Sequence, residues 1–155
     1  MSGDRWADTR IECAAVLATE RSIIEHTNFV TALPLPILVS TCSRSRSIHS
    51  RSAPIQVKGA ERGLKVMSKY DRSPILLAYV IDPRGEDSLV SIMTGADAWQ
   101  LPEEYERAGG KASNYDAEGE SYCWPKVTTI LKELLEGRRA SGERWLHLFE
   151  EVRAK

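Results

Sequence analysis

The segment PILVSTCSRSRSIHSRSAPIQVKG, residues 36–59, decides how this chain folds. Its two apolar runs predict the strands of a hairpin, and the Arg- and Ser-rich middle predicts a long basic turn between them. Side chains alternate along a strand, so Gln56 and Lys58 share one face while Ile55 and Val57 share the other. The second strand therefore combines a core-facing side with a polar side that can line a site.

Composition is that of an ordinary soluble globular domain. The chain has 155 residues, 42% of them hydrophobic and 28% charged, which is enough for one sizeable core. No apolar run approaches the roughly 20 residues that span a bilayer, and the first residues lack the pattern of a secretory signal. We expect a single domain over residues 1–155, with no membrane segment and a cytoplasmic location.

The three cysteines, Cys13, Cys42 and Cys123, are widely spaced and odd in number. They form no Cys-x-x-Cys pair and have no histidine at the spacing of zinc ligands. Neither a structural zinc site nor a disulfide framework is expected.

Charge is nearly balanced overall, with a formal net charge of −1, but it is unevenly distributed. Residues 44–72 are strongly basic, and such a stretch is either a polyanion-binding surface or a solvated loop and strand edge. The residues assigned here to a nucleic-acid-binding surface are Arg44, Arg46, Arg51, Arg62, Lys65 and Lys69.

The remaining pattern predicts an α/β fold with a central mixed or antiparallel-rich sheet and flanking helices. An amphipathic helix is expected over about 9–26, with Leu17 and Ile24 on its apolar face and Asp8 or Thr9 as its N-cap. A continuous apolar run at 75–81 predicts a central strand buried on both faces. The other expected elements are a strand at 89–93, a helix at 95–105, a loop at 108–121 and two C-terminal helices, with Pro125 at the start of the first. The sheet core then covers about 9–105 and the C-terminal helical part about 125–154.

Gln56-Val57-Lys58-Gly59 follows a strand of the form x-Ile-Leu-Val and precedes the apolar strand at 75–81. In this the chain resembles the PD-(D/E)XK nuclease superfamily in its Gln-x-Lys variant, in particular small bacterial members of uncharacterised function. The resemblance implies a restriction-endonuclease-like core. Its first helix donates a Glu, and its hairpin carries an Asp on the first strand and Glu/Gln-x-Lys on the second.

Carried over by position, the resemblance gives Lys58, Gln56 and Glu12 as catalytic residues, with Glu12 and Gln56 also as ligands of a divalent ion such as Mg²⁺. In such a site the ion lowers the pKa of a bound water and neutralises charge on the phosphate, while the lysine acts as a point charge. The sequence departs from the pattern at Pro36, where the family has its Asp; Glu61 is a further candidate acid.

Three hypotheses about function remain open at this point. The first is a metal-dependent DNA hydrolase, and the second is a degenerate nuclease fold that binds DNA without cutting it. The third is a non-catalytic interaction module, for example an immunity or regulatory protein, that binds a protein partner through the C-terminal helices. Against the first two, Gln56 and Lys58 also fit the solvent face of an antiparallel strand, and Glu12 also fits a surface acid. The aromatic residues fit packing roles in the core or between helices better than a base-stacking platform; these residues are Trp99, Trp124, Trp145, Tyr105, Tyr115 and Tyr122. Tyr122 and Trp124, beside a Gly-containing loop, are the ones to examine for stacking.

Overall fold

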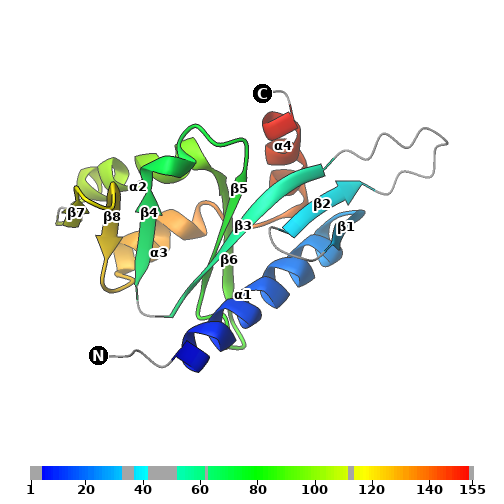
Figure 1. Ribbon diagram of the computed structural model, residues 1–155, viewed down its shortest axis with the longest axis horizontal. Coiled ribbons are helices and arrows are strands. Elements are labelled where there is room, and N and C mark those ends of the chain that lie inside the picture. Colours follow the sequence, from blue (N-terminus) through cyan, green and yellow to red (C-terminus); the bar gives the residue numbers. More distant parts are fainter. Residues whose placement is uncertain (1–4, 33–36, 42–51, 62, 112–113, 154–155) are drawn as a thin grey trace.

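The computed structural model of the protein describes residues 5–32, 37–41, 52–61, 63–111 and 114–153. Within these, the chain forms α1 (Arg5–His26), β1 (Phe29–Ala32), β2 (Ile37–Thr41), β3 (Ser52–Ala60), β4 (Leu64–Met67), the 3₁₀ helix η1 (Ser68–Tyr70), β5 (Leu76–Ile81), β6 (Leu89–Thr94), α2 (Gly95–Arg107), β7 (Asn114–Asp116), β8 (Ser121–Trp124), α3 (Thr129–Glu136) and α4 (Gly142–Arg153). The expected α/β fold with a central mixed sheet and flanking helices is confirmed (Figure 1).

The main sheet has five strands in the order β1-β2-β3-β5-β6. Neighbours are antiparallel except for β3 and β5, which run parallel with Gln56 opposite Leu77 and Lys58 opposite Tyr79. The hairpin predicted from residues 36–59 is confirmed as β2 and β3, in which Ile37 pairs with Ile55. A second, antiparallel sheet has the order β4-β8-β7.

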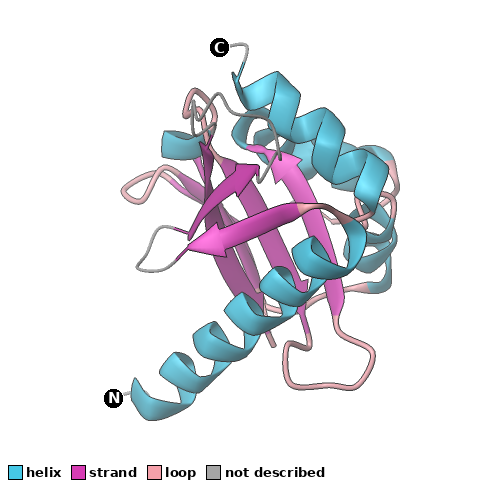
Figure 2. Ribbon diagram, turned by 90° about the vertical axis from the view of Figure 1, so that its right-hand side faces the viewer, coloured by secondary structure: helices cyan, strands magenta, loops and turns pink. Residues whose placement is uncertain are grey.

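Strand β5 separates two cores because both of its faces are buried. Leu76, Ala78 and Val80 belong to the core under α1 and α4, with Ile55 of β3. Leu77 and Tyr79 belong to the core formed with β4, β8, α2 and α3. The α1 and α4 helices therefore cover one face of the main sheet, and α2, α3 and the small sheet cover the other (Figure 2).

Helix α1 differs from its prediction in two ways. It begins at Arg5, so Asp8 and Thr9 lie inside the helix and do not cap it. Leu17 and Ile24 were expected on the apolar face, but their side chains are 65% and 63% exposed. The buried side of α1 is instead formed by Ala15, Thr19 and Ile23, and the spacing of apolar residues alone was misleading because they occur on both sides of the helix.

The prediction for the segment 108–121 missed part of the small sheet. This segment was expected to be a loop, but it contains β7 and leads directly into β8.

The first C-terminal helix was expected to start at Pro125, but it begins at Thr129. Its N-cap is Thr128, whose side chain accepts a hydrogen bond from Leu131 N at 3.2 Å. The second begins at Gly142.

The C-terminal helices bury most of their apolar side chains in the protein itself. Leu131 and Leu135 of α3 and Trp145, Leu148 and Phe149 of α4 are all at most 5% exposed. Leu146 is the large apolar residue of these helices that remains exposed, at 52%. No described helix is long and apolar enough to cross a membrane.

Gly59 sets how closely α1 approaches the main sheet. A Cβ at Gly59 would lie 2.8 Å from Ile11 Cγ2 and 3.3 Å from Ala15 Cβ, both on α1. Distances this short require the helix or its side chains to shift, so glycine is needed for the observed packing. The contact fixes the N-terminal half of α1 beside the last residues of β3.

Gly59→Ala is expected to destabilise the protein by about 1–3 kcal/mol, the usual cost of overpacking a core. The matched control is Gly137→Ala, because a Cβ at Gly137 would meet nothing closer than 3.5 Å. Urea denaturation followed by circular dichroism measures both free energies of unfolding. Equal stability of the two variants would contradict the role given to the close approach at Gly59.

Candidate functional site

Gln56 and Lys58 lie on the face of β3 that points away from α1. Ile55 is in the core under α1, and Gly59 meets Ile11, so alternation directs Gln56 and Lys58 to the opposite face. Their parallel partners Leu77 and Tyr79 belong to the second core, and both polar side chains are half-buried at its margin. The predicted separation of a polar and a core-facing side on this strand is confirmed.

Glu12 approaches the same strand end from the other side of the sheet. It lies three, seven and eleven residues before Ala15, Thr19 and Ile23, so helical periodicity directs it toward the sheet side of α1. It follows Ile11, which contacts Gly59, yet its own side chain is exposed. Glu12 and Lys58 therefore lie beside the C-terminal half of β3 and Gln56 lies at its middle, but Glu12 does not share a face with Gln56 and Lys58.

Tyr79 connects Lys58 with the small sheet. The Tyr79 hydroxyl donates to the backbone oxygen of Lys65 on β4 at 3.2 Å. Burial raises the pKa of Tyr79 well above its ordinary value, so this residue remains a neutral donor. Tyr79 of β5 thus lies between Lys58 of β3, its partner in register, and the backbone of Lys65 on β4.

Lys65 and Lys69 are the two residues of the predicted nucleic-acid surface that the structure describes. Both are exposed: Lys65 Nζ lies 3.9 Å from Asp116 Oδ2, and Lys69 Nζ lies 5.0 Å from the centre of the Tyr70 ring. The predictions for Arg44, Arg46, Arg51 and Arg62, and for Pro36 at the position of the family's Asp, fall outside the described residues.

The described residues do not fit a Mg²⁺ site. In this part of the chain no group of three His, Cys, Asp or Glu residues is arranged to hold a metal ion. Glu61 is ion-paired with Arg84, and the Gln56 side-chain amide donates to Val57 O at 3.2 Å. Glu12 and Gln56, the predicted ligands, lie on opposite sides of the sheet, whereas Mg²⁺ needs closely spaced oxygens in octahedral geometry.

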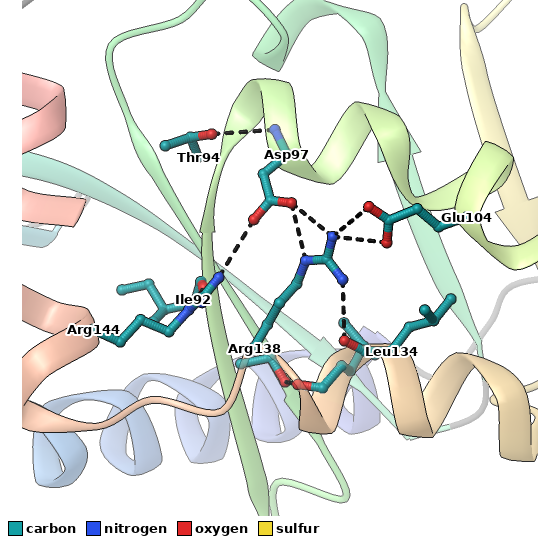
Figure 3. Close-up of polar contacts among 9 residues, drawn as sticks. Ile92, Thr94, Asp97, Glu104, Leu134, Arg138 and Arg144 are labelled. Carbon is teal, nitrogen blue, oxygen red and sulfur yellow. Dashed lines mark hydrogen bonds and ion pairs between the residues drawn. The ribbon is translucent and has the colours of Figure 1, made fainter. Parts of the chain in front are cut away.

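A second polar cluster, which the sequence did not reveal, joins α2 to the segment between α3 and α4 (Figure 3). Arg138 donates to Asp97 at 2.7 Å and 3.1 Å, to Glu104 at 2.8 Å and 2.9 Å, and to Leu134 O at 3.1 Å. Arg144 donates to Ile92 O at 2.8 Å and lies 3.4 Å from Asp97. Two arginines thus balance two carboxylates.

The electrostatics of this cluster fit a structural role. Burial disfavours the charge on Arg138, but hydrogen bonds and charges from Asp97 and Glu104 outweigh it and raise the pKa of Arg138. Burial lowers the pKa of Arg144, which Asp97 partly offsets. Both guanidinium groups stay charged. Arg138 O also accepts from Ile92 N at 2.9 Å, so the cluster holds the 138–140 segment against the outer edge of β6.

The aromatic residues of β8 have different environments. Trp124 is buried at 4% exposure in the second core, which confirms the expected packing role, and its ring lies 5.7 Å from that of Tyr105. Tyr122 is half-buried between Trp99 at 5.2 Å and Tyr115 at 4.9 Å, centre to centre. Of these rings, Tyr115 is the well-exposed one, at 53%.

Comparison of the chain with protein-family models, with curated proteins and with solved structures finds no match. The role of Gln56 and Lys58 on β3 is therefore inferred from the chemistry of these residues and their neighbours.

Arg138→Ala is expected to destabilise the protein by about 2–3 kcal/mol, because it leaves two partly buried carboxylates without their main donor. The control is Arg107→Ala, whose exposed pair with Glu103 should contribute less than about 1 kcal/mol. Chemical denaturation measures both. If Arg138→Ala lowers the free energy of unfolding by no more than Arg107→Ala does, the structural role of the cluster is contradicted.

Proposed function

We propose that the protein is a nucleic-acid-binding domain related to the PD-(D/E)XK nucleases, with Lys58 as its central phosphate contact. The observation that carries this proposal is the position of Lys58 on β3, half-buried on the same face as Gln56, in the C-terminal half of the parallel β3–β5 pair, which ends at Ala60 and Ile81. In α/β sheets, ligand sites form at the carboxyl ends of parallel strands. A partly desolvated lysine there attracts a phosphate more strongly than a fully hydrated one.

The order of elements supports the relationship. The resemblance implies a first helix, a hairpin with Gln-x-Lys on its second strand, and a further strand that extends the sheet. Helix α1, the β2–β3 hairpin and β5, parallel to β3, follow that order. Glu12 on α1 comes within one residue of the contact between α1 and the end of β3.

The proposed activity is binding without hydrolysis. The described residues do not supply a carboxylate cluster for Mg²⁺, and the hairpin has Pro36 where the family has its Asp. In this account Lys58 donates to a phosphate oxygen, and Gln56 contributes hydrogen bonds that orient the backbone of the nucleic acid.

Lys58→Ala is expected to weaken binding to a fluorescently labelled DNA duplex and to lower the slope of log K against log salt by about 0.9, the loss of one phosphate contact. The matched control is Lys132→Ala, which removes the same charge from an exposed position on α3. Fluorescence anisotropy at several salt concentrations measures affinity and slope together.

Two results would contradict the proposal. Equal salt slopes for the wild type and Lys58→Ala would remove Lys58 from the interface. Mg²⁺- or Mn²⁺-dependent cleavage of the duplex that disappears in Lys58→Ala would overturn the non-hydrolytic assignment, and would mean that residues outside the described part complete a metal site.

A further inference from the structure

The outer edge of β6 is covered by the segment 138–140, which lies between α3 and α4. Ile92 N donates to Arg138 O at 2.9 Å, and Ala140 N donates to Val90 O at 2.8 Å. An isolated antiparallel bridge lies between these two hydrogen bonds. The three residues 138–140 therefore form an edge strap, in the place that a sixth strand of the main sheet would take.

Strand β6 has the features of a strand that pairs on both sides. Its sequence, LVSIMT, contains no charged residue and no proline, and all six residues are buried. Natural edge strands are usually protected by charges, proline, bulges or a covering segment. In β6 the edge strap gives that protection, because it pairs with the outward-facing backbone groups of Val90 and Ile92.

Charged side chains hold the edge strap in place. The guanidinium group of Arg138 lies between Asp97 and Glu104, and that of Arg144 lies 3.4 Å from Asp97 (Figure 3). Burial lowers the pKa of Arg144; Asp97 partly offsets this, and the positive charge of Arg138 lowers the pKa further. Asp97 contacts both arginines, so it is the group that offsets the repulsion between them.

We infer that the edge strap keeps β6 from pairing with the β6 strand of a second copy, and that Asp97 holds the strap closed. Two uncovered β6 strands pair antiparallel about a two-fold axis, because each then supplies the N–H and C=O groups that the other lacks. Their six residues form a longer pairing than the four of β1, the strand at the other edge of the sheet.

The strap opens while the helices on either side of it stay packed. Leu135 of α3 and Trp145 of α4 are at most 1% exposed, and they anchor the two helices in different cores. Strand β5 separates β6 from β3, so the edge strap acts independently of Lys58.

Native-state hydrogen exchange of the wild type tests the strap without a substitution. The N–H groups of successive residues in an antiparallel strand point to alternate sides. That of Ile92 bonds to the strap, so those of Ser91 and Met93 point to β5. The amides of Ile92 and Ala140 should exchange with one common opening free energy and at least about tenfold faster than those of Ser91 and Met93.

Asp97→Asn should open the strap, and the matched control is Glu104→Gln, which removes the same charge from a residue that contacts Arg138. Over about 1–200 µM chain, sedimentation velocity should show Asp97→Asn forming a larger species than the wild type, while Glu104→Gln keeps the wild-type mass. In Asp97→Asn the Ile92 amide should lose protection in dilute solution and regain it at high concentration, where the second copy pairs with it.

Three results would overturn the inference. The first is exchange of Ile92 at the same rate as Ser91 and Met93 in the wild type, a result that does not depend on any variant folding. The second is an Asp97→Asn variant that keeps its near-UV circular dichroism and the wild-type mass. The third is an associated Asp97→Asn variant whose Ile92 amide stays unprotected, because association would then use another surface.

Discussion

The burial of β5 on both faces is the constraint on which the rest of the structure depends. Its alternate residues enter two different cores, so each face of the sheet must be covered by its own layer. Helices α1 and α4 cover one face, and α2, α3 and the small sheet cover the other. Strand β3, parallel to β5, is thereby held with Ile55 in one core and with Gln56 and Lys58 at the margin of the other.

This arrangement explains why the polar residues of β3 are neither free surface groups nor a buried network. Tyr79, the partner of Lys58 in register, is fully inside the second core, while Lys58 itself is half-buried. A charged group at the boundary of a core keeps access to a ligand and loses part of its hydration. The candidate site therefore lies where the polar face of β3 meets the edge of the second core. On the opposite face of β3, the close contact at Gly59 fixes the position of α1.

Much of the fold could be predicted from the sequence because its signals were local. The apolar run at 75–81 and the alternation at Ile55–Lys58 each specify a strand and its buried side without knowledge of the partner strands. The short strands β7 and β8 could not be predicted, because segment 108–121 has few large apolar residues. Strand β7 pairs only with β8, and β8 in turn pairs with β4, more than 50 positions earlier. The exposure of Leu17 and Ile24 was also hidden, since a helix with apolar residues on two sides does not reveal which side meets the sheet.

The candidate site was predictable in part. Gln56 and Lys58 share a face because side chains alternate along a strand. Whether Glu12 lies on that face depends on which side of the sheet α1 covers, and the local sequence does not specify this. The Arg138–Asp97–Glu104 cluster depends on contacts between residues up to 41 positions apart, and no motif marked it.

The most direct test of the central claim, that the end of β3 is the nucleic-acid surface, is an NMR titration of ¹⁵N-labelled protein with a short DNA duplex. The account predicts that the largest amide shift changes fall on Gln56, Lys58 and Gly59 and on Lys65 of β4. Changes confined to α1 or α4, or no saturable change at low salt, would contradict it.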